Sequence, residues 1–476
     1  MSTAKSTPTS TASATALPVA APLPAVRRAG GRLLALLGAL VALLLLGALA
    51  FAAMVVLHLY QAEPLVDSSP QVPAAQQQVG GTPAERGAYL ARVGNCMQCH
   101  TATGGTPYAG GRGIETPFGV VYSTNLTADA DTGMGRWTQA EFWRALHHGR
   151  SRDGRLLYPA FPYTSYTQVT RADADALFAF LQGVPAAVRP NRPHALRFPY
   201  DTQLALAAWR TLFFQPGADA PVPPVPPAAL GAQAPAWQRG AYLVGGLGHC
   251  AACHTPRNAL GASLEARALG GGLIPVQNWY APALDKATEA GVAHWPLQEV
   301  VDLLKVGVAP QGSVIGPMAE VVFNSTQYLS DADAAAMALY LQSLPPRQSA
   351  AAEQEAQAAP AAGAVPDARG AKVYEQQCAQ CHGEQGEGKA GAFPALAGNR
   401  ALVMDDPTNV LRVLLQGGYL PATAGNPRPH GMPPFLQTLE DEDLAAVATF
   451  VRGAWGNRAG RVDTIDAHRA RERRAP

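Results

Sequence analysis

The longest apolar stretch of the chain lies near its start. Residues 33–57 contain no charged side chain, and they follow Arg27, Arg28 and Arg32. As a helix rising ~1.5 Å per residue this stretch would be about 37 Å long, which exceeds a hydrocarbon core of ~30 Å. The preceding arginines place the start of the chain in the cytoplasm. The pattern therefore predicts a single-pass anchor in the inner membrane, with everything after it in the periplasm.

A cleavable signal peptide is the alternative interpretation of this stretch. The tripeptide Ala48-Leu49-Ala50 resembles a processing site. A cleaved apolar region is usually about 7–15 residues long, so the longer run favours an anchor. Residues 1–32 begin with a Ser/Thr/Ala/Pro tract without periodicity, which predicts a disordered cytoplasmic tail.

From about Thr82 onwards one pattern of polar and apolar positions occurs three times. Each repeat opens with Arg-Gly-Ala and closes with an apolar helical run that follows Asp residues, which suit a helix start. A glycine on the first helix and an aromatic residue on the last predict that these two helices cross closely. The opening residues are Arg86-Gly87-Ala88, Arg239-Gly240-Ala241 and Arg369-Gly370-Ala371; the closing ones are Asp173, Asp333 and Asp443 with Phe180, Tyr340 and Phe450.

The three repeats predict an all-α protein with tandem domains at 80–183, 237–345 and 367–457. The linker at 184–236 contains an apolar cluster that predicts a short helix packed on another domain, a partner subunit or the membrane surface. Residues 346–366 are rich in Ala, Gln and Pro and predict a flexible linker, and 458–476 predict a solvated basic tail. The apolar cluster consists of Leu204, Leu206, Trp209, Leu212, Phe213 and Phe214.

All six cysteines fall in one motif, CxxCH, which occurs once in each repeat. Two thiols on adjacent turns of a short helix can both form thioethers to one porphyrin, and the following histidine is then held beneath the iron. A zinc ribbon would need a second CxxC, and a redox CxxC has no need of the histidine. The sequence predicts three covalently bound haem c groups, attached at Cys96 and Cys99, Cys250 and Cys253, and Cys378 and Cys381, with His100, His254 and His382 as iron ligands.

A methionine is the common second axial ligand of an electron-transfer haem. In the second and third repeats Met318 and Met432 lie at corresponding positions beside prolines, and both are predicted to bind iron. In the first repeat the matching position is Phe161, which has no lone pair to give. Met134, His147 and His148 are the substitutes, and Met134 keeps the usual chemistry, whereas a histidine at a helix end suits the helix dipole.

The chain is similar to the tri-haem cytochrome c subunit of bacterial membrane-bound dehydrogenases. The resemblance covers about 82–457 and rests on the three CxxCH motifs, the two Met loops and strings such as STNLTADADTGMGRWT, YPAFPYTSY and RGAYLVGGLGHCAACHTPRNALGA. It implies three class I-like cytochrome c domains, matured outside the cytoplasmic membrane. It also implies a catalytic dehydrogenase subunit as electron donor, and quinone, a terminal oxidase or another cytochrome as acceptor.

Known donors in this family are quinoprotein alcohol dehydrogenases, flavin-dependent sugar or gluconate dehydrogenases and molybdenum hydroxylases. Phe161 in YPAFPY, together with AAWRTLFF in the linker, favours the molybdenum hydroxylases. The expected function is electron transfer without substrate chemistry, and the formal net charge of +1 gives no sign of a nucleic-acid partner. A multi-haem peroxidase with an open first haem is the alternative, but it needs a distal acid–base group that the sequence does not supply. A haem-based gas sensor would need an output domain.

Overall fold

The computed structural model describes Met1 and residues 26–60, 81–215, 228–345 and 367–473. The chain divides into two units, Met1–Leu57 and His58–Pro476. The expected disordered tail falls largely on 2–25 and the expected flexible linker on 346–366, both outside the described residues.

Helix α1 (Val26–Tyr60) contains the predicted anchor. Its part Leu33–Tyr60 has a mean hydropathy of 2.9, and it is the one helix in the described part of the chain that is long and apolar enough to cross a membrane. Nearly all of its apolar side chains are exposed, as a helix surrounded by lipid requires. Length and composition therefore agree with the anchor predicted from the sequence.

In each repeat the first and last helices cross at a glycine. Helix α2 (Pro83–Val93) packs on α6 (Arg171–Gln182), α8 (Ala234–Tyr242) on α12 (Asp331–Gln342), and α14 (Ala368–Gln377) on α17 (Asp441–Gly453). A Cβ added to Gly87 or Gly240 would lie 1.9 Å from the carbonyl oxygen of the crossing helix, and one added to Gly370 would lie at 2.2 Å. Beside each glycine lies the aromatic residue of the closing helix. The predicted close crossing is confirmed.

Each CxxCH motif contains a short helix, which lies in the sequence between the first and last helices of its repeat. These short helices are α3 (Cys96–Cys99), α9 (Ala251–His254) and α15 (Ala379–His382). The second repeat has one more residue between its Arg and its first Cys than the first repeat, and the π-helix η3 (Leu243–Leu247) lies there. A π-turn takes up one extra residue. The other helices are α4 (Gln139–His148), α5 (Tyr163–Tyr166), α10 (Leu297–Lys305), α11 (Pro317–Asn324), α16 (Thr408–Gln416), η2 (Ala228–Gln233), η4 (Glu265–Arg267), η5 (Thr326–Tyr328) and η6 (Arg400–Leu402).

The fold is largely helical, but the prediction of an all-α protein misses three small antiparallel sheets. Their strands are too short and too rich in glycine to show an alternating pattern in the sequence. They are β1 (Gly113–Thr116), β2 (Gly119–Tyr122) and β3 (Ala195–Leu196) in one sheet, β4 (Gly270–Ile274) with β5 (Trp279–Ala283), and β6 (Val308–Ala309) with β7 (Gly312–Ser313).

Described parts of two segments predicted to lie outside the repeats, the 184–236 linker and the C-terminal basic tail, are folded against the repeats. Strand β3 of the 184–236 linker pairs with β2, and α7 (Gln203–Phe213) buries Leu206 while Leu204 and Leu212 stay exposed. Contrary to the prediction of a solvated basic tail, α18 (Thr464–Glu472) packs on α17. Val462 and Ala467 of this segment are buried in the core of the third repeat, and Arg471 donates to Asp441 at 2.6 Å and to the carbonyl of Leu439 at 2.7 Å.

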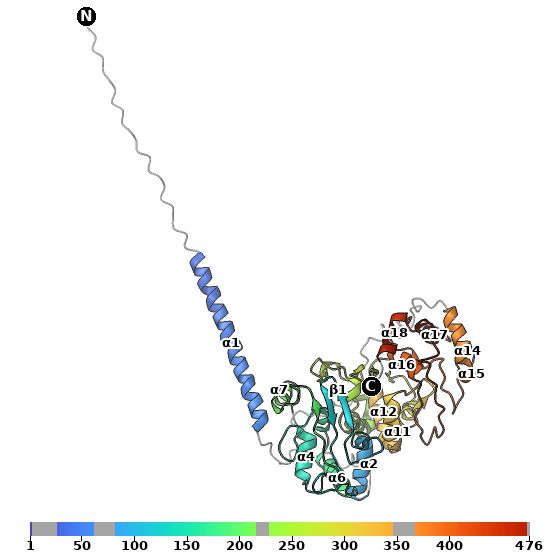
Figure 1. The fold of residues 1–476 in the computed structure, drawn as a ribbon, viewed down its shortest axis with the longest axis horizontal. Coiled ribbons are helices and arrows are strands. Elements are labelled where there is room, and N and C mark those ends of the chain that lie inside the picture. Colours follow the sequence, from blue (N-terminus) through green and yellow to red (C-terminus); the bar gives the residue numbers. More distant parts are fainter. Residues whose placement is uncertain (2–25, 61–80, 216–227, 346–366, 474–476) are drawn as a thin grey trace. The chain divides into compact units, whose positions relative to one another are not determined.

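The first and second repeats share one hydrophobic core, whereas the third has its own. In Figure 1 the helices of the third repeat, α14, α16, α17 and α18, form a group of their own within the unit His58–Pro476. It meets the second repeat at β5, where the Asn409 side chain accepts from the backbone N–H of Tyr280 at 2.9 Å and donates to its carbonyl at 2.7 Å.

Candidate haem-binding sites

The three CxxCH motifs have the chemistry that a covalently bound haem needs. None of the six cysteines forms a disulfide, so each sulfur is available for a thioether to haem. Within each motif the backbone N–H of the histidine donates to the carbonyl of the first cysteine, at 2.9 Å in the first motif and 3.0 Å in the other two. Both thiols and the imidazole are therefore held by one helical turn, which is the spacing that a single porphyrin requires.

A hydrogen bond fixes the tautomer of every motif histidine. The Nδ1 atom of His100 lies 2.7 Å from the carbonyl of Thr124, that of His254 lies 2.7 Å from the carbonyl of Pro282, and that of His382 lies 3.0 Å from the carbonyl of Pro394. A carbonyl only accepts, so Nδ1 must carry the proton and donate. This leaves the Nε2 lone pair for a metal, as in other metal-ligating histidines. The residues present fit haem c at all three sites.

Burial favours the ligating form of these histidines. It lowers the pKa of His100, His254 and His382, although the hydrogen bond to the carbonyl acts in the opposite direction. A neutral imidazole binds iron, whereas an imidazolium does not. The three motifs therefore hold their histidines ready to bind a metal at neutral pH.

One cavity of about 1940 Å³ joins the first motif to the second repeat. Its lining includes Cys99, His100 and Phe161 of the first repeat and Cys253 of the second. A single space thus reaches the first haem site and the edge of the second.

The backbone confirms which residue of the first repeat matches Met318. The N–H of Val314 donates to the carbonyl of Gly307 at 2.9 Å, and the N–H of Leu157 donates to that of Gly149 at 2.8 Å. Counting on from these equivalent bonds brings Phe161 to the position of Met318. Phe161 packs edge-on against Tyr166 with ring centroids 5.4 Å apart. An aromatic ring therefore stands where the second repeat presents a thioether.

The loop that carries Met318 is held by a close contact. Gly316 has a φ of 54°, and a Cβ there would lie 2.8 Å from the ring of Trp279. Only glycine tolerates both conditions. Met318 is half-buried against Val314 and Val322. In the third repeat Met432 exchanges two backbone hydrogen bonds with Gly418, at 3.1 and 2.7 Å, and it packs on the core of that repeat.

The three substitutes for a first-repeat ligand differ in their surroundings. Met134 is 3% exposed and lines the cavity with His100, but its backbone is pinned to Thr127 and Trp137. His147 also lines the cavity and stacks on Trp143 with ring centroids 4.3 Å apart. Burial, followed by the charge of His148, lowers the pKa of His147 to about 4. His148 does not line this cavity.

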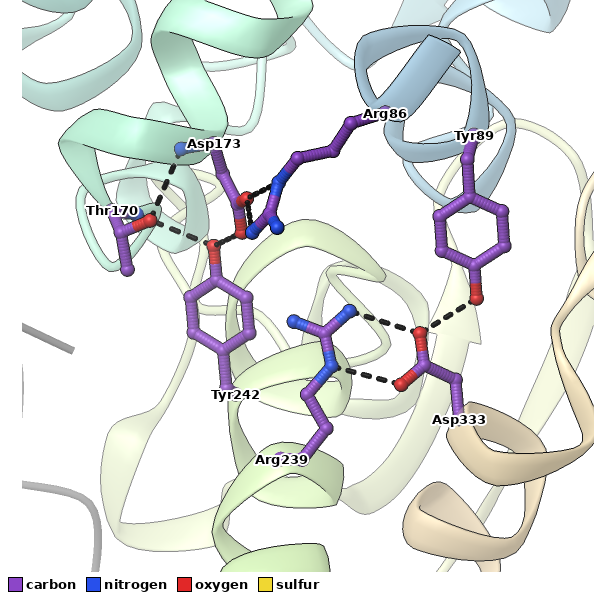
Figure 2. Close-up of polar contacts among 7 residues, drawn as sticks. All are labelled: Arg86, Tyr89, Thr170, Asp173, Arg239, Tyr242 and Asp333. Carbon is purple, nitrogen blue, oxygen red and sulfur yellow. Dashed lines mark hydrogen bonds and ion pairs between the residues drawn. The ribbon is translucent and has the colours of Figure 1, made fainter. Parts of the chain in front are cut away.

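Sequence reasoning missed the contacts that join the first two repeats. The Asp residues of the closing helices have the sequence context of caps, but Thr170 and Ser330 are the caps, and each accepts from the N–H of the Asp. The carboxylates of Asp173 and Asp333 instead bind arginine and tyrosine side chains (Figure 2). The signal in the sequence is Arg-x-x-Tyr, which occurs at 86–89 and 239–242.

Comparison with known proteins gives the family. The Cytochrome c family matches residues 84–185 and 368–455, which include the first and third motifs. The cytochrome c subunit of the quinone alcohol dehydrogenase of Gluconacetobacter polyoxogenes is 39% identical over 405 residues, covering 82% of this chain and 85% of that protein. The chain belongs to the cytochrome c subunits of membrane-bound dehydrogenases.

Two further relatives show how broad this family is. The gluconate 2-dehydrogenase cytochrome c subunit of Pantoea cypripedii is 37% identical over 402 residues, covering 81% of this chain and 88% of that protein. A nicotinate dehydrogenase subunit of Pseudomonas putida is 40% identical over 374 residues, which are 77% of this chain but 30% of that protein. A segment similar to this chain thus also occurs within a much longer protein.

Proposed function

We propose that this protein is the electron-transfer subunit of a membrane-bound dehydrogenase complex, with three haem c groups in three cytochrome c domains. The observation that carries the proposal is the repeated pairing of CxxCH with a histidine whose Nδ1 is bound to a carbonyl. The domains correspond to 80–183, 237–345 and 367–457. Haem c, when bound, supplies reversible one-electron chemistry at iron.

The residues of this chain hold and tune that chemistry. The six cysteines would attach the porphyrins, and the three motif histidines would bind iron. Met318 and Met432 would be further iron ligands in the second and third domains, and Met134 is the candidate in the first. A thioether ligand raises the reduction potential. The first site, with Phe161 in place of methionine, is therefore expected to have the lowest potential unless Met134 supplies the thioether.

The donor is a catalytic dehydrogenase subunit, for which we favour a molybdenum hydroxylase over enzymes that depend on pyrroloquinoline quinone or flavin. Phe161 in the first repeat supports this choice. So does the relative named for nicotinate dehydrogenase, because nicotinate is a nitrogen heterocycle. The acceptor is quinone or another component of the respiratory chain. Helix α1 anchors the protein in the inner membrane, with the haem domains in the periplasm.

Purification of the native complex tests the donor. The tagged full-length chain is extracted from membranes with mild detergent, and the co-purifying subunit is analysed for molybdenum, pyrroloquinoline quinone and flavin. Stoichiometric molybdenum, together with haem reduction by an aldehyde or N-heterocyclic substrate, is the expected result. Pyrroloquinoline quinone, or flavin without molybdenum, would contradict the choice of donor, and haem oxidation by hydrogen peroxide with turnover would favour the peroxidase.

A further inference from the structure

Each Asp at the start of a closing helix in the first two repeats binds groups from both repeats (Figure 2). Asp173 accepts from Nε of Arg86 in its own repeat at 2.9 Å and from the hydroxyl of Tyr242 in the second repeat at 2.7 Å. These donors meet different carboxylate oxygens, Oδ1 and Oδ2. One carboxylate is therefore shared by the two repeats.

The second half of the arrangement repeats the first with the roles exchanged. Asp333 accepts from Arg239 of its own repeat at 2.8 and 2.9 Å, and from the hydroxyl of Tyr89 in the first repeat at 2.6 Å. Each repeat thus contributes one tyrosine and receives one. We call the two contacts, Tyr89–Asp333 and Tyr242–Asp173, the tyrosine latches.

The carboxylates of the latches are buried, so the hydrogen bonds that they accept affect stability. Asp173 and Asp333 are each only 1% exposed. A buried carboxylate is costly unless all its charge is compensated. Within one repeat a single arginine faces each carboxylate, and the tyrosine that completes the compensation comes only from the docked neighbour. The two repeats therefore satisfy their carboxylates in one mutual orientation.

The third repeat shows what happens without a latch. Arg369 and Asp443 form the equivalent ion pair at 2.6 Å, but Lys372 stands three residues after the arginine, where the other repeats have tyrosine. The Arg369 side chain stays 52% exposed. Tyr374 donates instead to the carbonyl of Gly383, within its own repeat, at 2.6 Å. The repeat that lacks the latch tyrosine is also the one with a separate core.

Further contacts between the first two repeats involve the CxxCH motifs or a residue beside them. Gln98, inside the first CxxCH motif, donates to Glu320 at 2.7 Å and accepts from Asn324 at 2.9 Å. Both residues lie on α11, the helix that carries Met318. In the opposite direction His249, beside the second motif, packs edge-on against Tyr166 with ring centroids 5.6 Å apart. The first motif thus contacts the helix that carries Met318, and a residue beside the second motif contacts Tyr166, which packs on Phe161.

We propose that Tyr89 and Tyr242 are positioning residues whose hydroxyls fix the first and second haem sites in one orientation relative to each other, whereas the third site is placed by other contacts, such as those of Asn409 with Tyr280. This inference rests on the proposed function only in assigning haem to the CxxCH motifs. It accounts for the shared cavity that Cys99 and Cys253 line. It also predicts that loss of both hydroxyls loosens the pair without disturbing either motif.

The test compares the double variant Tyr89→Phe/Tyr242→Phe with Tyr374→Phe in the full-length, haem-loaded protein. The control removes a buried tyrosine hydroxyl that bonds only within the third repeat. The readout is the Soret circular dichroism couplet, which depends on the mutual orientation of neighbouring haems, alongside haem content and the spectrum of each haem. The double variant should lose more than half of the couplet with three haems retained, and the control should keep it.

Two results would overturn the inference. One is a couplet of wild-type size in the double variant, and the other is an equal loss in Tyr374→Phe. If the double variant loses haem, the single variants decide by the same measurement: each should reduce the couplet partly, and two unchanged couplets would refute the latch. Absence of haem from the wild-type protein would instead refute the proposed function, so the two failures are distinguishable.

Discussion

Replacing Gly240 by alanine should destabilise the first two repeats, because this glycine is the point at which α8 crosses α12. The added Cβ would lie 1.9 Å from the carbonyl oxygen of Ala336 and 2.9 Å from the Cβ of Tyr340. A carbon atom normally approaches such an oxygen to about 3.3–3.6 Å. The helices must therefore separate by roughly 1 Å or more at the crossing, estimated from that normal contact distance.

The cost of this separation can be estimated. Overpacking a core typically costs about 1–3 kcal/mol, and a clash with backbone puts this variant at the upper end. Alanine gains back about 0.5–1 kcal/mol through helix propensity. The net loss of about 2 kcal/mol should lower the melting temperature by roughly 4–8 °C, given the size of the shared core of the first two repeats.

The assay is thermal unfolding of the haem-loaded protein in detergent, followed at the Soret band. Gly453→Ala is the matched control, because Gly453 also lies in a helix but has no heavy atom within 4 Å of an added Cβ. This control should be neutral or stabilised by up to about 1 kcal/mol. A Gly240→Ala protein that melts with the wild type would refute the close crossing.

Four further outcomes are expected. Met318→Leu and Met432→Leu should each remove one methionine–iron charge-transfer band. Each should also lower one haem potential by a sizeable part of the roughly 0.8 V range that axial ligands set. The control Met337→Leu, in the core of α12, should do neither. Met134→Ala should remove a third such band if Met134 binds the first haem; if the wild type shows two bands only, that haem should have the lowest potential. Burial, followed by the charge of Asp333, raises the pKa of Tyr89 from 10.0 to about 12. The protonated Tyr89 hydroxyl therefore makes its full contribution to the free energy of unfolding below pH 10, and this contribution is lost as the pH rises towards 12. Over this interval Tyr89 should account for roughly 2–3 kcal/mol of unfolding free energy, and Tyr89→Phe should flatten this part of the stability–pH curve.

Much of the architecture could be predicted because its signals are local. The anchor is a single uninterrupted apolar run, and the motif cysteines and histidines are adjacent in sequence. The crossing of the helices follows from Gly87, Gly240 and Gly370, since a residue without a side chain among apolar helical positions indicates a close neighbour. These features need no knowledge of contacts between distant parts of the chain.

Two of the missed features depend on contacts between residues that are far apart in the sequence. Asp333 has the sequence context of a helix cap, and nothing near it indicates that its oxygens bind Tyr89, which lies 244 residues earlier. Arg471 sits in a basic stretch that resembles a solvated tail, yet Asp441 and two carbonyls draw it onto the third repeat. The short strands were missed for a different reason, because two to five residues are too few to show an alternating pattern.

Intact mass measurement of the mature chain purified from native membranes tests the central claim most directly. The account predicts the polypeptide mass plus three haem groups that survive denaturation, one attached at each of the motifs 96–100, 250–254 and 378–382. A fully matured protein that carries two haems or fewer, or haems that dissociate on unfolding, would contradict it.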